Sequence, residues 1–505
     1  MTHALGRAWR LTAILIVGFA SGLPLALTGQ AMQAWLTVDG VDLATIGFFA
    51  LVGVPYTFKF LWAPLMDRFE PPWLGRRRGW LMVTQLTLAG LLAWMSTLSP
   101  TAHAGLFALA AVLVAFFAAS QDIVVDAYRT DLLPEDERGL GASFHVFAYR
   151  LAMILSGGIT LIWAGQWQSW PRVYLVMAAI MATCALASLL LPSVHHASKP
   201  LDSDPKRELL GFCAMLVGVA AGYWLGRSVW MLLGLAPNDP NKWIQLLFVV
   251  TEIAFALPLA WWMARRAGFE TLNRSLNSYF AQTGAGAFLL LIILYKLGDA
   301  FAGSLTTPFL IKGMGFLQEE VGIANKLIGI WLTILGAFIG GLLMTRFSLY
   351  KALLLFGILQ GVSNFGFYAL ASLGKGAWGT ILLPAFDWGF VSLASPATLD
   401  WLLLTVIAGE NITGGMGTVA FVALLMALCN QHFTATHYAL LSAFAAVGRI
   451  YIGPLAGVMS ESIGWPAFFL ISVVMAVPGV VMVLWMSGAL QSLGRRGPRA
   501  EENGA

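Results

Sequence analysis

The residues most able to do chemistry lie at the end of an apolar run, in the string SQDIVVDAYRTDLLPEDERG at 120–139. Asp122 and Asp126 are four positions apart and share one face of a helix, and Arg129 follows Asp126 by one turn. A charged side chain inside a bilayer costs about 2.5–3.5 kcal/mol on insertion scales. Two carboxylates on one face therefore need a water-filled cavity, a cationic partner or a proton. We predict proton coupling at Asp122 and Asp126, with a gate or structural ion pair of Asp126 and Arg129 as the open alternative.

Other ionisable side chains interrupt apolar runs elsewhere in the sequence. The cations Lys59, Arg150, Lys296 and Arg449 outnumber the carboxylates Asp122, Asp126 and Asp299. Because buried charges in a membrane protein face a cavity or a partner, this surplus predicts a cationic cavity and an anionic substrate. The predicted substrate-binding residues are Gln33, Tyr56, Lys59, Gln121, Arg129, His145, Arg150, Tyr295, Lys296, Asp299, Asn411 and Arg449.

Less specific interpretations of the same residues stay open. Lys296 and Asp299 are three positions apart and can neutralise each other, which would leave no site. The other cations can extend to the membrane surface or close salt bridges between helices, and Arg227 fits a structural role. Further along, Gly414, Gly415 and Gly417 allow helices to approach closely or a span to unwind. Glu410 and Asn411 come just before them and are expected at the mouth of a cavity or in it.

The composition shows which solvent surrounds these residues. Of 505 residues, 59% are hydrophobic and 11% are charged, whereas soluble domains carry about 25% charged residues. Such a chain needs lipid around it, and its basic residues form no stripe that would suggest nucleic acid. We find no phosphate-binding loop, no HExxH or paired-cysteine motif and no nucleophile elbow, so the sequence predicts no enzyme, no metal and no cofactor besides a proton gradient. Cys184, Cys213 and Cys429 lie in apolar runs and are expected to be buried small residues.

Runs of about 20 apolar residues predict about 14 membrane-spanning helices in an all-α protein. They fall at 11–32, 43–66, 80–98, 104–127, 140–164, 173–191, 209–235, 243–264, 285–309, 323–345, 351–372, 399–428, 436–459 and 465–487. The segment 374–398 is apolar but broken by Pro384, Asp387 and Pro396. We interpret it as an ordered extracytoplasmic loop, with a re-entrant segment as the open alternative.

Six spans precede a polar segment, two follow it, and six more complete the chain. This arrangement predicts two six-helix bundles with an inserted two-helix hairpin, on the major facilitator plan. The predicted divisions are an N-terminal bundle at 1–194, a cytoplasmic linker at 195–208, the hairpin with a cytoplasmic segment at 209–278, a C-terminal bundle at 279–490 and a cytoplasmic tail at 491–505.

The charges of the loops predict the orientation of the chain. Basic residues gather in the loops of one side: Arg7, Arg10, Arg68, Arg76, Arg77, Arg78, Arg138, Lys199, Lys206, Arg207, Arg265, Arg266, Arg274, Arg346, Lys351, Arg495, Arg496 and Arg499. The other side has little beyond Arg172, Lys242, Lys312 and Lys375. Both termini are therefore predicted to be cytoplasmic, which requires an even number of spans.

Several strings resemble one family of membrane proteins. The string at 120–139, GGMGTVAFVALLMALCN at 414–430, YALLSAFAAVGRIYIGP at 438–454 and FASGLPLALTG at 19–29 are similar to the AmpG family of muropeptide permeases, within the major facilitator superfamily. Gln121, Asp122 and Asp126 also occur in a similar string of the eukaryotic acetyl-coenzyme A transporters, so they indicate the wider group only. GMGTVAFVALLM is more specific and favours the bacterial permeases.

The resemblance implies a function. It implies proton-driven import of anhydromuropeptides, GlcNAc-1,6-anhydro-MurNAc peptides, across the cell inner membrane by alternating access. Such import supplies peptidoglycan recycling and β-lactamase induction, and it implies a multi-pass protein in membrane lipid that acts as a monomer. Transport of another bulky anion, such as a coenzyme A thioester, is the alternative within transport. A membrane-bound transferase or sensor is the alternative outside it.

Overall fold

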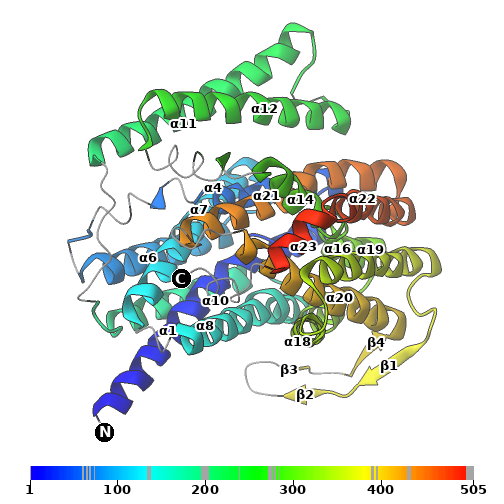
Figure 1. Ribbon diagram of the computed structural model, residues 1–505. Helices are drawn as coiled ribbons and strands as arrows, with labels where there is room; N and C mark the ends of the chain where they lie inside the picture. The colour runs from blue at the N-terminus through cyan, green and yellow to red at the C-terminus, as the bar shows by residue number, and fades with distance from the viewer. Residues whose placement is uncertain are drawn as a thin grey trace.

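The structure is a computed structural model that is almost entirely helical (Figure 1). It describes residues 2–59, 62–63, 66, 70–72, 74–133, 138–194, 204–237, 239–270, 277, 280–281, 284–387, 392–393, 396–428 and 434–495. Some residues used above to predict orientation or burial lie outside this part of the chain: Arg68, Lys199, Arg274, Cys429, Arg496 and Arg499. Cys184 is buried as predicted, but the prediction is wrong for Cys213, which is exposed on the inserted pair of helices. Most of the predicted linker at 195–208 does too, so the boundaries between the predicted divisions remain predictions.

The helices of the N-terminal half surround the first predicted proton site. They are α1 (Thr2–Leu27), α2 (Gln30–Val38), α3 (Leu43–Phe48), η1 (Phe49–Gly53), α4 (Val54–Phe58), α6 (Arg76–Ser96), α7 (Ala104–Leu132), α8 (Arg138–Met153), η4 (Ile154–Ile159), α9 (Thr160–Trp167) and α10 (Trp170–Leu189). η4 is a single π-helical segment between α8 and α9. Such segments interrupt regular helices and occur often at functional sites.

The C-terminal half follows the inserted pair α11 (Pro205–Leu232) and α12 (Lys242–Arg266). Its helices are α14 (Ala285–Tyr295), α15 (Leu297–Gly303), α16 (Thr306–Pro308), η5 (Phe309–Gly313), α17 (Gln318–Val321), η6 (Gly322–Ile328), α18 (Gly329–Met344), α19 (Leu349–Leu373), α20 (Trp401–Ala427), α21 (Thr434–Ile463), α22 (Trp465–Trp485) and α23 (Ser487–Arg495). η5 and η6 are also π-helical.

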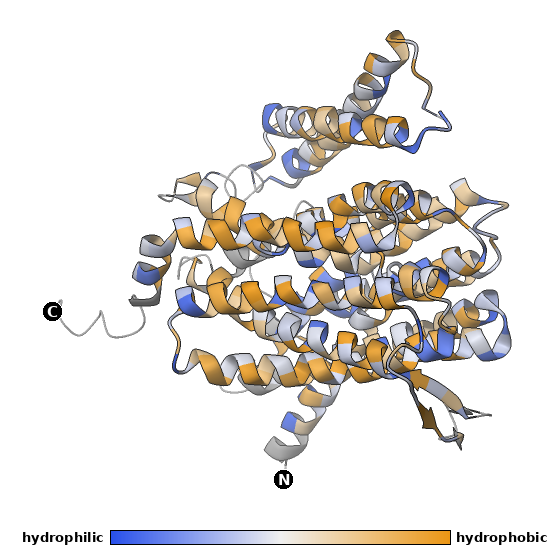
Figure 2. Cartoon of the chain, turned by 90° about the vertical axis from the view of Figure 1, so that its right-hand side faces the viewer, coloured by the Kyte–Doolittle hydropathy of each residue, from blue (hydrophilic) through white to orange (hydrophobic). Residues whose placement is uncertain are grey.

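Thirteen stretches of the described chain are long and apolar enough to cross a membrane. The shorter apolar helix Leu43–Phe58 lies where the second predicted span begins. Together they match the fourteen predicted runs, so the prediction of an all-α polytopic membrane protein is confirmed. Figure 2 shows apolar residues along the outward faces of the helices, and hydrophilic residues gather towards their ends. This distribution is expected of helices whose solvent is lipid.

The segment predicted to be an ordered loop folds as a β-hairpin. β1 (Thr380–Leu383) pairs antiparallel with β4 (Ala397–Asp400), and β2 (Phe386–Asp387) pairs with β3 (Ser392–Leu393). The hairpin lies beside the helices at the lower right of Figure 1, and the re-entrant alternative stays an open prediction. Pro384 falls between β1 and β2, where its missing N–H interrupts no ladder.

The inserted helices α11 and α12 pack closely on each other and stand apart from the other helices, at the top of Figures 1 and 2. Three glycines on α11 face α12, and a methyl group on Gly222 would lie 2.4 Å from Ala256 Cα. Small residues at four-residue spacing allow such an approach in lipid. Arg227 lies 3.8 Å from Glu252 of α12, which agrees with a structural role for this arginine.

One end of the pair is anchored to the two halves. Lys242 Nζ lies 3.2 Å from Asp42 Oδ1, just before α3, and Trp243 Nε1 donates a hydrogen bond of 3.1 Å to Ser462 Oγ of α21. Leu246 packs nearby in a small apolar cluster with residues of α3 and α21. Large apolar side chains elsewhere on the pair are exposed, as lipid-facing helices require.

An aromatic cluster ties together the N-terminal half. The Trp35 ring of α2 stacks on Trp170, with centroids 6.3 Å apart, and packs on Tyr174, with centroids 4.9 Å apart. Tyr174 Oη donates a hydrogen bond of 2.6 Å to the Leu27 carbonyl, so the buried phenol is satisfied. The cluster fixes the end of the first span against the start of the sixth.

The C-terminal half repeats this arrangement. α22 begins with Trp465-Pro, as α10 begins with Trp170-Pro, and Phe469 stands one turn later where α10 has Tyr174. Phe309 of the ninth span, the first of the C-terminal half, packs on both rings, with centroids 5.1 Å from Trp465 and 4.6 Å from Phe469. The matching clusters support the two-half plan.

Candidate functional site

A cavity of about 590 Å³ lies between the two halves. The N-terminal half lines it with the ends of α1, α2 and α4, and the C-terminal half with α15, α20 and α21. Five predicted residues line it: Gln33, Tyr56, Lys296, Asp299 and Arg449. Its volume falls within the range of sites for small organic ligands, about 300–1,000 Å³.

Gln33 links the two halves at this cavity. Its Nε2 donates a hydrogen bond of 2.9 Å to the carbonyl of Ser304, and Ser304 also lines the cavity. Tyr56 lies one turn before Lys59 on the second span, so it stands between the cavity and the predicted proton site. Gln33 thus forms a hydrogen bond across the cavity between the two halves.

Lys296 stands at a break between α14 and α15. Its Nζ lies 3.6 Å from Asp299 Oδ2 and 3.5 Å from both Gln360 Oε1 and Thr418 Oγ1. The pairing with Asp299 that the spacing allowed is therefore present. It leaves a site nonetheless, because the Asp299 side chain is 33% exposed and both residues line the cavity.

Tyr295 and Asn411 lie beside the cavity and make packing or hydrogen-bonded contacts. Tyr295 Oη donates to the Leu353 carbonyl at 3.1 Å, and its ring stacks on Phe421. Asn411 Nδ2 donates to Glu410 Oε2 at 3.0 Å, and its Oδ1 accepts from Thr333 Oγ1 at 2.8 Å. Neither residue lines the cavity, so their predicted substrate contacts stay predictions.

The predicted proton site lies in the N-terminal half. Lys59 Nζ lies 3.5 Å from Asp122 Oδ2, and Ser21 Oγ donates a hydrogen bond to the other carboxylate oxygen. Neighbouring Gln121 is fully buried, and neither polar atom of its amide has a hydrogen-bond partner among the described residues. The Asp122 carboxylate thus has, in Lys59, the cationic partner that its burial requires.

Asp126 and Arg129 form the ion pair that the alternative interpretation predicted. Arg129 Nη2 lies 3.3 Å from Asp126 Oδ1, and the Asp126 side chain is 55% exposed. This exposure separates Asp126 from Asp122, whose side chain is 16% exposed. A surface ion pair of this kind needs no cavity, so proton coupling at Asp126 remains a prediction.

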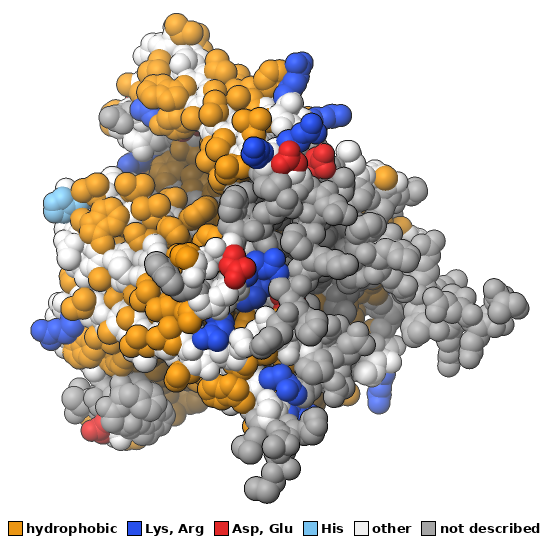
Figure 3. All heavy atoms as spheres, turned by 90° about the vertical axis from the view of Figure 1, so that its left-hand side faces the viewer, with side chains coloured by type: hydrophobic (Ala, Val, Ile, Leu, Met, Phe, Trp, Pro, Cys, Tyr) orange, Lys and Arg blue, Asp and Glu red, His pale blue; other side chains and the backbone are white. Residues whose placement is uncertain are grey.

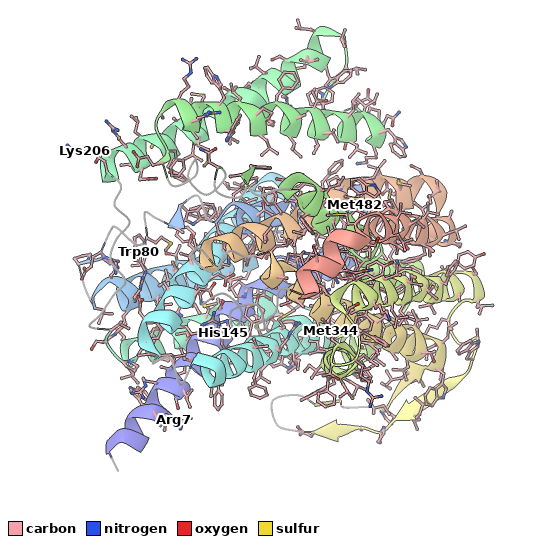
Figure 4. The ribbon with its side chains drawn as sticks, in the orientation of Figure 1. Arg7, Trp80, His145, Lys206, Met344 and Met482 are labelled. Atoms are coloured by element: carbon pink, nitrogen blue, oxygen red, sulfur yellow. The ribbon has the colours of Figure 1, made fainter. Side chains whose placement is uncertain are left out.

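His145 and Arg150 lie on α8, against α1 and near the cavity. A methyl group on Gly18 of α1 would lie 3.0 Å from His145 Nδ1, so the imidazole fills the groove that this glycine leaves. Arg150 Nη1 lies 3.9 Å from the sulfur of Met153, and Met153 lines the cavity. Figure 4 shows His145 among the helices of the N-terminal half. The roles of both residues in binding stay predictions.

Two charged residues near the cavity were missing from the predicted binding set. Glu410 lines the cavity and is within electrostatic reach of Lys326, a buried lysine of η6. The sequence placed Glu410 at the mouth of a cavity or in it, but not in the binding set. Lys326 was overlooked because it stands close to the start of an apolar run, where a lysine ordinarily reaches the membrane surface. The sequence could have indicated Lys326, because it is the one charged residue among the seven of Gly322–Ile328.

Close crossings join the two halves beside the cavity. Where η4 meets η6, a methyl group on Gly322 would lie 2.8 Å from the Gly158 carbonyl oxygen. Where α3 meets α21, a methyl group on Gly47 would lie 2.5 Å from the Gly453 carbonyl oxygen. At each crossing the two backbones are so close that only glycine fits between them. Both crossings lie towards helix ends that the sequence predicts to be periplasmic: Val38, Leu43, Trp167, Gln318 and Ile463.

These features define a class of protein: a polytopic helical transporter with a cavity between two halves. Residues 14–399 match the Major Facilitator Superfamily. The chain is 44% identical over 475 residues to the anhydromuropeptide permease of Escherichia coli (strain K12), covering 94% of this chain and 79% of that protein. It is 27% identical to the putative transporter AmpG 4 of Rickettsia conorii, covering 95% and 97% of the two chains.

The fold also occurs in solved structures. A POT family transporter in complex with a thioalcohol-conjugated peptide superposes with a TM-score of 0.65 at 15% identity, covering 95% of this chain and 96% of that one. At this identity the likeness concerns the fold alone. The chain belongs to the major facilitator superfamily and, within it, to the anhydromuropeptide permease family.

Proposed function

We propose that this protein imports anhydromuropeptides across the cell inner membrane, driven by the proton gradient and by alternating access between its two halves. The observation that carries the proposal is the cavity between the halves, with Lys296 and Arg449 in its lining, in a member of this permease family. The stem peptide of such a substrate carries carboxylates, and the two cations supply their counter-charge.

The substrate contacts we propose begin with the residues of the cavity. Gln33, Tyr56, Lys296, Asp299 and Arg449 surround the substrate, with Phe49 and Phe421 offering apolar faces to its sugar rings. The remaining members of the predicted set act at a distance or after rearrangement: Lys59, Gln121, Arg129, His145, Arg150, Tyr295 and Asn411. The protein uses no cofactor besides the proton gradient.

Asp122 is proposed as the carboxylate that carries the proton. A proton on Asp122 would remove the charge that faces Lys59, three positions from Tyr56 of the cavity lining. An isolated charge is costly in a membrane interior, so Lys59 would have to move or find another partner. The protonation state and the shape of the N-terminal half are then coupled.

The proposed orientation places both termini and the basic loops in the cytoplasm. Support comes from Figure 4, in which Arg7, Trp80 and Lys206 lie on the left, and from Figure 1, in which the β-hairpin lies at the opposite side. Figure 3, viewed from that left-hand side, shows lysine and arginine side chains on a largely apolar surface. We propose a monomer surrounded by membrane lipid, with the divisions at 1–194, 195–208, 209–278, 279–490 and 491–505.

Uptake into reconstituted vesicles tests the proposal. Labelled anhydromuropeptide should accumulate when the outside is acidic, and addition of a protonophore should abolish the accumulation. Unlabelled anhydromuropeptide should compete and acetyl-coenzyme A should not. Absence of uptake under a proton gradient, or competition by the thioester alone, would refute the proposed substrate.

A further inference from the structure

Glu410 lies in a network of two carboxylates and two lysines in the C-terminal half. It lines the cavity, where Lys296 and Asp299 also lie, and it is within electrostatic reach of both and of Lys326. Its carboxylate accepts a hydrogen bond of 3.0 Å from Asn411 Nδ2. The network is neutral when all four groups are ionised.

Lys326 connects this network to the crossing of the two halves. Its side chain is 6% exposed and packs on η4 of the other half. A methyl group on Gly158 would lie 2.9 Å from Lys326 Cβ, and one on Gly157 would lie 3.7 Å from Lys326 Cδ. The stem of the lysine therefore fills the place that two glycines leave open. Its charge depends on Glu410, because a buried ammonium group needs an opposite charge.

The polypeptide around Glu410 is also tied to the same π-helical segment. A methyl group on Gly329, directly after η6, would lie 3.1 Å from Asn411 Nδ2. Thr333 of α18 donates to Asn411 Oδ1 at 2.8 Å. A change at Glu410 therefore reaches the helix that crosses η4 in two ways, through the electrostatic interaction with Lys326 and through the hydrogen bonds of Asn411.

The other ionisable side chains on the described elements packed against α20 do not act on Glu410. α18 contains no ionisable residue, and α19 contributes Tyr350 and Lys351 at its start and Tyr368 near its end. β4 contributes Asp400, which caps the start of α20 through the Leu403 amide. Arg449 of α21 lines the same cavity. The charge of Glu410 is thus set by Lys296, Asp299 and Lys326.

An anionic group that enters this cavity adds one negative charge to the network. Lys296 is available to it at the cavity wall, while Asp299 and Glu410 are close enough to repel it. Like charges in one low-dielectric site favour protonation of one of them. Uptake of one proton by a carboxylate restores neutrality and leaves both lysines charged.

We propose that Glu410 is a second proton-coupling carboxylate, which takes up one proton when an anionic group of the substrate binds at Lys296. An O–H bond forms on the Glu410 carboxylate as an O–H bond of a hydronium ion breaks and leaves a neutral water molecule, and no other bond changes. Lys326 then faces a neutral partner at the crossing of η4 and η6. The inference rests on the proposed function and assigns its second proton site.

The test is proton uptake on binding, measured by isothermal titration calorimetry of the purified full chain in buffers of different ionisation enthalpy. Anhydromuropeptide is the probe, and the variants are Glu410→Gln, Lys326→Met, the double variant, and Glu461→Gln as an exposed control on α21. Wild type and control should take up equal numbers of protons. Glu410→Gln should take up about one proton fewer, because linkage between two binding events is reciprocal.

Transport gives a second readout that a merely structural role would not change. Glu410→Gln should retain exchange of labelled for unlabelled substrate and lose at least tenfold of its accumulation under an acid-outside gradient. Wild-type proton uptake and wild-type accumulation in Glu410→Gln would overturn the proposal. Loss of binding in folded Glu410→Gln without rescue in the double variant would also overturn it. Failure of wild type to bind anhydromuropeptide would instead refute the proposed function.

Discussion

Lys59 Nζ lies 3.5 Å from Asp122 Oδ2, one turn from a tyrosine of the cavity wall. The lysine belongs to the second span and the aspartate to the fourth, so the pair joins two helices of the N-terminal half. Its side chains are 28% and 16% exposed, which allows a proton to reach the pair while keeping it largely desolvated. Neutralising one partner should therefore leave the charge of the other unbalanced.

Replacing Asp122 with asparagine should separate exchange from accumulation. The variant cannot bind the proton, so uptake driven by a pH gradient should fall at least tenfold while substrate exchange continues. Vesicle uptake and counterflow measure the two activities, and Glu461→Gln serves as the control.

Lys59→Met combined with Asp122→Asn should be more stable than Asp122→Asn alone, because removing one partner of a buried pair leaves an unpaired charge. Undiminished gradient-driven uptake in Asp122→Asn would exclude this residue as the proton carrier.

Replacing Arg449 with glutamine should weaken substrate binding. Arg449 lines the cavity and is exposed to it. A hydrogen bond to a charged group is worth about 1.5–3 kcal/mol, which corresponds to a roughly 10- to 100-fold higher Kd. Calorimetric titration with anhydromuropeptide measures this change. Lys351→Gln, at the exposed start of α19, should bind as wild type does, and an equal Kd for Arg449→Gln would remove it from the binding set.

The sequence predicted the membrane spans and the set of ionisable residues within them. Apolar runs of span length have no alternative solvent, so all fourteen appear in the structure, the second only in part. The set of ionisable residues was also visible. Which of them meet at the cavity was not, because this depends on helix rotation: Asp299 faces the cavity, whereas Asp122 faces Lys59.

Other features required pairing information that a single sequence carries weakly. The strands at 380–383 and 397–400 are short and apolar, and an apolar segment broken by prolines is equally compatible with a loop. The role of Lys326 depends on the glycines of η4, which lie about 170 positions earlier in the chain. The Trp-Pro repeat at 170 and 465 was readable and would have strengthened the two-half prediction.

A valine at Gly222 should destabilise the inserted helix pair. The Cβ of any side chain there would lie 2.4 Å from Ala256 Cα, which is backbone and cannot move aside without separating the helices. Overpacking of this kind typically costs about 1–3 kcal/mol. Thermal unfolding in detergent should show a lower Tm for Gly222→Val. Gly90→Val, where the space beside α6 is open, should keep a Tm close to that of wild type, and equal values for both variants would contradict the packing argument.

Acid should weaken the anchor between the inserted pair and α3. Burial raises the pKa of Asp42, but hydrogen bonds from Thr45 and the charge of Lys242 outweigh it, and the net result is a lowered pKa. A carboxyl whose pKa is lowered by folding stabilises the fold above its unfolded value, about 3.9, and this stabilisation is lost as the pH falls through the folded value.

The distance between spin labels at Leu233→Cys and Ile463→Cys measures this anchor. Its distribution should broaden below about pH 4 in wild type and should already be broad at pH 7 in Asp42→Asn. Asp204→Asn, which removes an exposed carboxylate charge at the other end of α11 and keeps the capping oxygen, should retain the pH response. A distribution that is narrow at every pH in Asp42→Asn would show that the Asp42–Lys242 pair does not hold the helices in place.

An alanine at Gly453 should open the crossing of α3 and α21. The added methyl group would lie 2.3 Å from Ala50 Cβ, so the two helices must separate for the chain to accommodate it. Because this crossing lies at the predicted periplasmic end, Ser304 of the cavity wall should become accessible from outside. In a background without the 3 native cysteines, Ser304→Cys should react at least several times faster with an impermeant maleimide when Gly453→Ala is present. Gly448→Ala on the same helix meets only an ordinary contact of 3.5 Å and should leave the rate unchanged, so equal acceleration by both substitutions would show that Gly453 does not close this end of the cavity.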